Sequence, residues 1–129
     1  MPKQLKKILI VDDEPDIVEI LSYNLAKNED FEIFKAYDGS QAFDSAVSIL
    51  PDVIIMDIWM PGISGLEACR MIRRNAALKS TPVLILTSDT DEYKGLEAAA
   101  AGCNEFVTKS VKPAFIVAMV KDLIAARNH

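Results

Sequence analysis

Val-Ile-Ile-Met-Asp, residues 53–57, is the stretch of sequence that decides the fold. Apolar, mostly β-branched residues in an unbroken run indicate a strand that is buried on both faces. The Pro51-Asp52 pair before the run and the loop around Pro61 after it limit the strand to these few residues. Asp57 therefore stands at the carboxyl end of a short, fully buried strand.

Similar apolar runs recur along the chain and predict further strands. These strands are expected at residues 8–11, 31–36, 83–86 and 105–108. Apolar residues at helical spacing follow each run. They predict a helix after Pro15 and further helices at about residues 42–50, 66–74, 92–101 and 113–127. The buried face of the first helix is predicted at Ile17, Ile20, Leu21 and Leu25.

This strict alternation of strands and helices predicts the class of the fold. Strands that are apolar throughout need cover on both faces, and parallel strands are joined by right-handed helical crossovers. The sequence therefore predicts an α/β fold, a doubly wound five-stranded parallel sheet with helices on both faces. Ligands bind beyond the carboxyl ends of the strands in such sheets, so the residues directly after each strand are the candidates for function.

Composition and charge exclude several classes of protein. A length of 129 residues with 50% apolar content is typical of one domain whose core needs no disulfide or structural metal. A net charge of −5 offers no basic surface to nucleic acid. The first apolar run is too short for a signal peptide or a membrane span. Cys69 and Cys103 lack metal-ligand spacing, so we expect small buried thiols in a reducing, cytoplasmic compartment.

Polar residues with related chemistry stand at the carboxyl ends of the predicted strands. They are Asp12, Asp13, Asp57, Thr87, Ser88 and Lys109. Carboxylates brought to one sheet edge repel one another by about 4 kcal/mol per pair at about 4 Å and an effective dielectric constant of about 20, so a cation is needed there. Oxygen ligands without histidine or cysteine suit Mg²⁺, with Mn²⁺ as a substitute. A lysine and a hydroxyl beside such a cation are typical of phosphoryl transfer, here to a carboxylate.

Four motifs occur in a fixed order, each at the end of a predicted strand. They are residues 11–15 (Val-Asp-Asp-Glu-Pro), residues 56–62 (Met-Asp-Ile-Trp-Met-Pro-Gly), residues 86–88 (Leu-Thr-Ser) and Lys109. This combination resembles the receiver domain of two-component response regulators and is similar to their single-domain, chemotaxis-type members. The resemblance covers the whole chain and implies a single receiver domain at residues 1–129, with a flavodoxin-like strand order of 2-1-3-4-5.

The resemblance implies that Asp57 is the phosphorylated residue and that Lys109 and Thr87 hold the phosphoryl oxygens. Thr87 and Phe106 would form a switch pair that moves when the phosphoryl group draws the hydroxyl inward. The donor would be a phosphohistidine on a sensor histidine kinase or a histidine phosphotransfer protein, and small acyl phosphates would substitute. Output would pass to a partner protein or domain. The chain would thus be no enzyme beyond phosphorylating and dephosphorylating itself.

The resemblance also implies a ligand set for the cation. Asp13, Asp57 and the backbone carbonyl of Trp59 would bind Mg²⁺ directly, whereas Asp12 would act largely through water. The Trp59 ring is expected to be partly exposed at the mouth of the site, because it follows the acceptor aspartate in a polar loop.

Two positions depart from the pattern of the family. Ser110 follows Lys109 where the family usually has proline, commonly after a cis peptide bond. A cis bond before a non-proline residue costs about 2.5–4 kcal/mol, so the loop is expected to be either strained or trans and differently shaped. Phe106 stands where tyrosine is also common, so a signal from its rotation would be steric.

Alternative functions follow from the same residues. Taken singly, the aspartates could be turn residues and Lys109 a surface charge. The departure at Ser110 favours a pseudo-receiver that acts as a constitutive protein-interaction module. A Mg²⁺-dependent phosphatase is the enzymatic alternative, but its Asp-x-Asp pair is missing because Trp59 stands two positions after Asp57.

Two helix faces carry further predictions. Arg73 and the neighbouring arginines are interpreted as the solvated face of a helix. The last helix is apolar almost all round, which is more than a helix that covers a sheet needs. Phe115, Ala118 and Met119 are therefore expected either to form a partner or homodimer surface or to make a deeper core contact.

Overall fold

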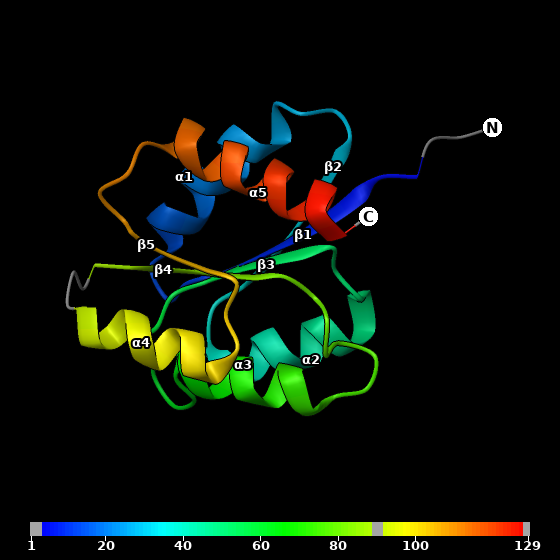
Figure 1. Cartoon of the computed structure of the whole chain (residues 1–129). Helices are drawn as coiled ribbons and strands as arrows, with labels where there is room; N and C mark the ends of the chain where they lie inside the picture. Colours follow the sequence, from blue (N-terminus) through cyan, green and yellow to red (C-terminus); the bar gives the residue numbers. More distant parts are fainter. Residues whose placement is uncertain (1–3, 89–91, 128–129) are drawn as a thin grey trace.

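The computed structural model describes residues 4–88 and 92–127, which form five strands and five helices in alternation (Figure 1). The strands are β1 (Lys6–Val11), β2 (Phe31–Ala36), β3 (Val53–Met56), β4 (Val83–Thr87) and β5 (Glu105–Thr108). The helices are α1 (Pro15–Ala26), α2 (Gly39–Ile49), α3 (Gly65–Arg74), α4 (Glu92–Ala101) and α5 (Pro113–Arg127). The predicted order of elements is confirmed. Among the strands, the start of β1 differs most from its predicted bounds, because its pairing with β2 already begins at Lys6.

The sheet has the order β2-β1-β3-β4-β5, and all its strand pairs are parallel. β1 and β3 end at the same level, since Val11 pairs with Met56, whereas β4 continues from Ile85, the partner of Met56, to Thr87 at the same edge of the sheet. Residues that follow these strands therefore emerge side by side at one edge. The predicted flavodoxin-like α/β fold is confirmed, and its switch in strand order lies between β1 and β3.

Two layers of helices cover the sheet. Figure 1 shows α1 and α5 on one face and α2, α3 and α4 on the other. Because successive side chains of a strand point to opposite faces, each central strand contributes to both layers of the core. In β1, Ile8 and Ile10 pack on the side of α1 and α5, whereas Leu9 and Val11 pack on the opposite side.

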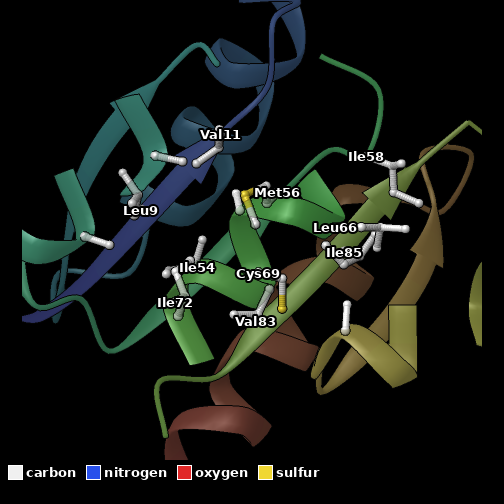
Figure 2. Close-up of a cluster of buried hydrophobic side chains, with 14 of the residues drawn as sticks. Leu9, Val11, Ile54, Met56, Ile58, Leu66, Cys69, Ile72, Val83 and Ile85 are labelled. Atoms are coloured by element: carbon white, nitrogen blue, oxygen red, sulfur yellow. The ribbon is translucent and has the colours of Figure 1, made fainter. Parts of the chain in front are cut away.

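The core cluster on the side of α2, α3 and α4 is shown in Figure 2, where Cys69 of α3 lies among side chains of the central strands. Cys69 is fully buried, as predicted, and Cys103 is half-buried and packs against the same cluster. Burial raises the pKa of the Cys69 thiol and raises that of Cys103 to about 11. Both thiols therefore stay protonated at neutral pH and behave as small apolar groups.

The predicted buried face of α1 is partly wrong. Val18, Leu21 and Leu25 are buried, whereas Ile20 is 50% exposed. These buried residues follow one stripe at a spacing of three to four residues beneath the sheet and α5, and Ile17 packs partly buried at its edge. Periodicity alone could not exclude Ile20, because it lies three residues after Ile17 and directly before Leu21.

The outer face of α5 exposes less apolar surface than predicted. Phe115 is 54% exposed and Ala118 is exposed, but Met119 is half-buried and packs against the core beneath the helix. Met119 therefore makes the deeper contact, which was the alternative expectation for this helix. Within residues 4–88 and 92–127, no helix, α5 included, is both long and apolar enough to cross a membrane.

The interpretation of Arg73 as part of a solvated helix face is wrong. Its guanidinium donates hydrogen bonds to the carbonyl oxygens of Gly102 at 2.9 Å and Thr81 at 2.7 Å, and to Oδ1 of Asn104 at 2.9 Å. These bonds join the end of α3 to the loops before β4 and before β5. Arg73 is therefore a structural residue, because its long side chain reaches loops that sequence spacing does not place beside it.

Candidate functional site

Backbone hydrogen bonds of the sheet fix two aspartates at its carboxyl edge. The Asp57 amide donates to the carbonyl of Val11 at 3.0 Å, and the Asp12 amide donates to the carbonyl of Ala36 at 3.2 Å. Asp12 and Asp57 are only 2% and 4% exposed, whereas Asp13 is exposed. Carboxylate oxygens of Asp12, Asp13 and Asp57 all lie within 4.8 Å of one another. We call these three residues the acidic triad.

Lys109 reaches the acidic triad from the loop after β5. Its amide donates to the carbonyl of Thr87 at 2.7 Å, which continues the pairing of β4 and β5. Its ammonium nitrogen lies 2.9 Å from Oδ2 of Asp12 and 3.4 Å from Oδ2 of Asp57. Residues that follow β1, β3 and β5 thus meet in one pocket.

Glu14 is a further contact of Lys109 that the sequence analysis did not predict. Its Oε1 lies 3.1 Å from the ammonium nitrogen, and its amide donates to Oδ1 of Asp12 at 2.9 Å. Glu14 stands at the N-cap of α1, but its side chain makes no capping hydrogen bond. The only signal in the sequence is its place directly after the aspartate pair, which does not tell how far it lies from the end of β5.

Close packing of α3 positions the loop that carries Asp57. A Cβ on Gly65 would overlap the carbonyl oxygen of Asp57, so only glycine fits there. The Gly65 amide donates to the carbonyl of Ile58 at 2.8 Å, and the Ile58 amide donates to Oδ1 of Asp57 at 2.9 Å. Ser64 caps α3 by accepting a hydrogen bond from the Glu67 amide at 3.2 Å. The Asp57 carboxylate is therefore oriented by the backbone around it.

The pocket holds more negative than positive charge. Burial, followed by the nearby charge of Asp12, raises the pKa of Asp57 from 3.8 to about 6, although Lys109 opposes the change. Burial also raises the pKa of Asp12. Burial by itself lowers the pKa of Lys109, but the hydrogen bond and charge of Asp12 outweigh it and the pKa is raised. One lysine thus does not neutralise the carboxylates around it, and the pocket favours a further cation.

The donor atoms of the acidic triad suit a hard metal ion. All three side chains offer carboxylate oxygens, and no histidine or cysteine of the described residues shares the cluster. Because Asp13 is exposed, the ligands leave room for water on one side. The acidic triad is therefore a site able to bind a metal ion of the Mg²⁺ type.

The other residues predicted for the site lie around the pocket in different ways. Thr87 is fully buried at the end of β4, and Ser88 after it is exposed. Phe106 is half-buried and packs against the core cluster of Figure 2. Trp59 is 52% exposed, and the ammonium nitrogen of Lys94 lies 4.7 Å from the centroid of its ring. A cation–π contact thus links the loop after β3 to α4.

The loop after Lys109 takes the trans form. No peptide bond among the described residues is cis, so the bond between Lys109 and Ser110 is trans. The hydroxyl oxygens of Ser110 and Thr108 lie 2.7 Å apart, within hydrogen-bond distance, and the Val111 amide donates to the carbonyl of Thr108 at 3.3 Å. The substitution at Ser110 therefore does not prevent Lys109 from reaching the acidic triad.

A flavodoxin-like sheet with an acidic triad and a lysine at its switch point defines the class of signalling receiver domains. The profile of the family described as "Response regulator receiver domain" matches residues 8–121. The chain therefore belongs to the response regulator receiver domain family, and the resemblance seen in its motifs is confirmed.

Solved structures of response regulators and of a receiver domain are similar over nearly the whole chain. A putative response regulator from Chloroflexus aurantiacus is 30% identical, with a TM-score of 0.87 and coverage of 95% of this chain and 99% of that one. The chemotaxis response regulator CheY4 of Vibrio cholerae is 30% identical, with a TM-score of 0.85 and coverage of 93% and 99%. The BeF3-activated DrrB receiver domain is 28% identical, with a TM-score of 0.85 and coverage of 95% and 99%.

Proposed function

We propose that this receiver domain is a phosphorylation-dependent switch of a two-component phosphorelay and that Asp57 is its phosphoacceptor. The observation that carries the proposal is the contact of the Lys109 ammonium with both Asp12 and Asp57 beside the acidic triad. Phosphoryl transfer depends mainly on positioning and on charge neutralisation, and this arrangement supplies both. The similar DrrB receiver domain was solved in a BeF3-activated form, and activation of that domain also supports the proposal that this one is a switch.

In the proposed reaction a carboxylate oxygen of Asp57 attacks phosphorus, and the bond from phosphorus to the imidazole nitrogen of the donor breaks. The electron pair of that bond returns to the imidazole. Lys109 neutralises one phosphoryl oxygen, and the Thr87 hydroxyl donates to another. Later attack by water on the acyl phosphate releases inorganic phosphate and restores the Asp57 carboxylate. The chain thus changes only its own state of phosphorylation.

We assign the metal site to Asp13, Asp57 and the backbone carbonyl of Trp59, with Asp12 acting largely through water. Mg²⁺ is the proposed ion and Mn²⁺ a substitute; when bound, it supplies positive charge for the oxygens of the transferred group. Purely oxygen donors and the exposed position of Asp13 support this choice. The residues of the chain orient the acceptor and provide the ligands.

The signal is proposed to leave the pocket through Thr87 and Phe106. Phosphorylation would draw the Thr87 hydroxyl inward and free space for the Phe106 ring. Gly95 of α4 lies beside that ring, because a Cβ built on it would be 3.7 Å from a ring atom. Movement of Phe106 would therefore alter the packing of α4 by steric contact alone, since phenylalanine has no hydroxyl.

The proposed partners follow from membership of the family. A sensor histidine kinase or a histidine phosphotransfer protein would supply the phosphoryl group, and a downstream protein or domain would receive the signal. We propose that residues 1–129 act as a single receiver domain in the cytoplasm and, with a net charge of −5, make no contact with nucleic acid. A homodimer through α5 stays a prediction, with Phe115 and Ala118 as its exposed apolar residues.

The proposal is tested by incubating the protein with acetyl phosphate and Mg²⁺ and measuring its intact mass. We expect a gain of one phosphoryl group that is absent in Asp57→Asn and retained in Asp44→Asn, a matched change at an exposed aspartate of α2. A wild-type protein without this gain would support the pseudo-receiver alternative, which the substitution at Ser110 favours. Many turnovers of a generic phosphate ester per chain would support the phosphatase alternative.

A further inference from the structure

The carboxylate of Glu14 forms an ion pair with Lys109 and does not cap α1, the helix that follows it. At the N-cap of α1, a short polar side chain would normally accept a hydrogen bond from the first turn. Glu14 makes no such bond, and its Oε1 lies 3.1 Å from the Lys109 ammonium nitrogen. The Glu14 side chain is 61% exposed, whereas the Lys109 side chain is 13% exposed. Glu14 therefore approaches the half-buried Lys109 side chain from the more exposed side of the contact.

We propose that Glu14 is the resting partner of Lys109, a positioning residue that pairs with the ammonium from the solvent side until an anion enters the pocket. This inference rests on the proposed phosphoryl transfer to Asp57 and adds a residue that regulates the same site. In the proposed reaction the Lys109 ammonium pairs with an oxygen of the incoming phosphoryl group. Glu14 competes for that charge, so it slows phosphorylation by anionic donors.

The direction of the effect follows from the contacts of Lys109. If the Glu14 carboxylate is removed, Asp12 still holds the ammonium at 2.9 Å, so Lys109 stays in the pocket. The pocket then carries one negative charge less and receives an anion more readily. Loss of the Glu14 carboxylate should weaken the binding of a metal cation. One nearby negative charge is lost, and Lys109 then pairs more strongly with Asp12 and Asp57, the carboxylates that attract the cation.

Three variants distinguish the effect of the ion pair between Glu14 and Lys109 from the effect of negative charge at the start of α1. Glu14→Gln removes the charge, and Glu14→Asp keeps it but shortens the side chain by one methylene and withdraws it from Lys109. Asp16→Asn removes a charge from the first turn of the same helix, where Asp16 is exposed and makes no ion pair with another described residue. For each variant, the rate of mass gain from acetyl phosphate at saturating Mg²⁺ and the dissociation constant of Mg²⁺ by calorimetry are compared with those of the wild type.

For Glu14→Gln we expect phosphorylation about two- to fivefold faster and Mg²⁺ binding about two- to fivefold weaker, the range that a partly exposed ion pair is worth. Glu14→Asp should change both in the same directions but less, and Asp16→Asn should change them least. Faster phosphorylation together with weaker Mg²⁺ binding is a combination that destabilisation of the fold alone does not produce.

Other results would overturn the role of Glu14. They are an unchanged rate in Glu14→Gln, slower phosphorylation together with weaker Mg²⁺ binding, or an Asp16→Asn effect as large as that of Glu14→Gln. Any of these would leave the proposed function intact as long as the wild type gains a phosphoryl group. A wild type without mass gain would instead refute the proposed function, and the role of Glu14 would fall with it.

Discussion

The ammonium nitrogen of Lys109 lies 3.4 Å from Oδ2 of Asp57, although the strands that precede the two residues are not neighbours in the sheet. β4 lies between β3 and β5, and adjacent strands are about 4.8 Å apart. The side chain of Lys109 must therefore pass the end of β4, where Thr87 lies, to reach the acidic triad. This length requirement explains why a lysine, with its long flexible stem, occupies the position.

Truncation of Lys109 should destabilise the metal-free protein. Lys109→Ala leaves the buried carboxylates of Asp12 and Asp57 without their cation, which should cost about 3 kcal/mol of unfolding free energy at pH 8. Urea unfolding measures this loss, and Mg²⁺ should restore a large part of it. Lys112→Ala, at an exposed lysine of the same loop, should change stability little. Equal stability of the two variants would show that Lys109 does not balance the pocket.

Mg²⁺ should stabilise the folded domain through the acidic triad. Because the ion binds the folded state only, millimolar Mg²⁺ should raise the melting temperature of the wild type by mass action. Asp13→Asn should relieve about 1 kcal/mol of repulsion in the metal-free protein and abolish the response to Mg²⁺. Differential scanning calorimetry with Mg²⁺ and with a chelator tests both effects. Lower stability of metal-free Asp13→Asn would mean that Asp13 is a structural hydrogen-bond acceptor.

Stability of the metal-free protein should fall as pH rises from about 4 to about 6. Burial and the charge of Asp12 raise the pKa of Asp57 from 3.8 to about 6, so over this interval the folded state binds more protons than the unfolded state. Linkage then requires stability to decrease with pH, by about 3 kcal/mol for a difference of this size. Asp57→Asn should flatten the profile measured by urea unfolding. A wild-type profile that rises over the same interval would contradict the electrostatic account of the pocket.

Two glycines offer a matched test of backbone packing at the site. Gly65→Ala should destabilise the fold by more than about 2 kcal/mol, because its Cβ would overlap the carbonyl oxygen of Asp57. Gly95→Ala places a Cβ in ordinary contact with the Phe106 ring within α4 and should stabilise the fold by about 0.5–1 kcal/mol. Thermal unfolding of both variants decides the matter. A tolerated Gly65→Ala would mean that α3 does not fix the backbone at Asp57, directly after β3.

Much of the fold could be predicted from local sequence. Strands buried on both faces leave unbroken apolar runs, so β3 and its neighbours were predicted within a residue or two. Convergence of Asp12, Asp57 and Lys109 followed from the rule that parallel strands end at a common edge. These features depend on chain order and strand direction, which the sequence displays directly.

Other features depend on distances that the sequence does not display. The contact of Glu14 with Lys109 requires the start of α1 to lie against the loop after β5, and the bonds of Arg73 require the end of α3 to lie beside the loop before β5. Exposure of Ile20 depends on which stripe of α1 the sheet and α5 cover. Such contacts depend on how each helix packs against the sheet and its neighbours, so the spacing of apolar residues along the sequence could not reveal them.

The most direct test of the central claim is to locate the acyl phosphate within the chain. After incubation with acetyl phosphate and Mg²⁺, borohydride reduction converts the phosphorylated aspartate to homoserine, which peptide mass spectrometry identifies. We predict that the reduced residue is Asp57 alone. Homoserine at another carboxylate, or at no position in a protein that retains its fold, would contradict the account.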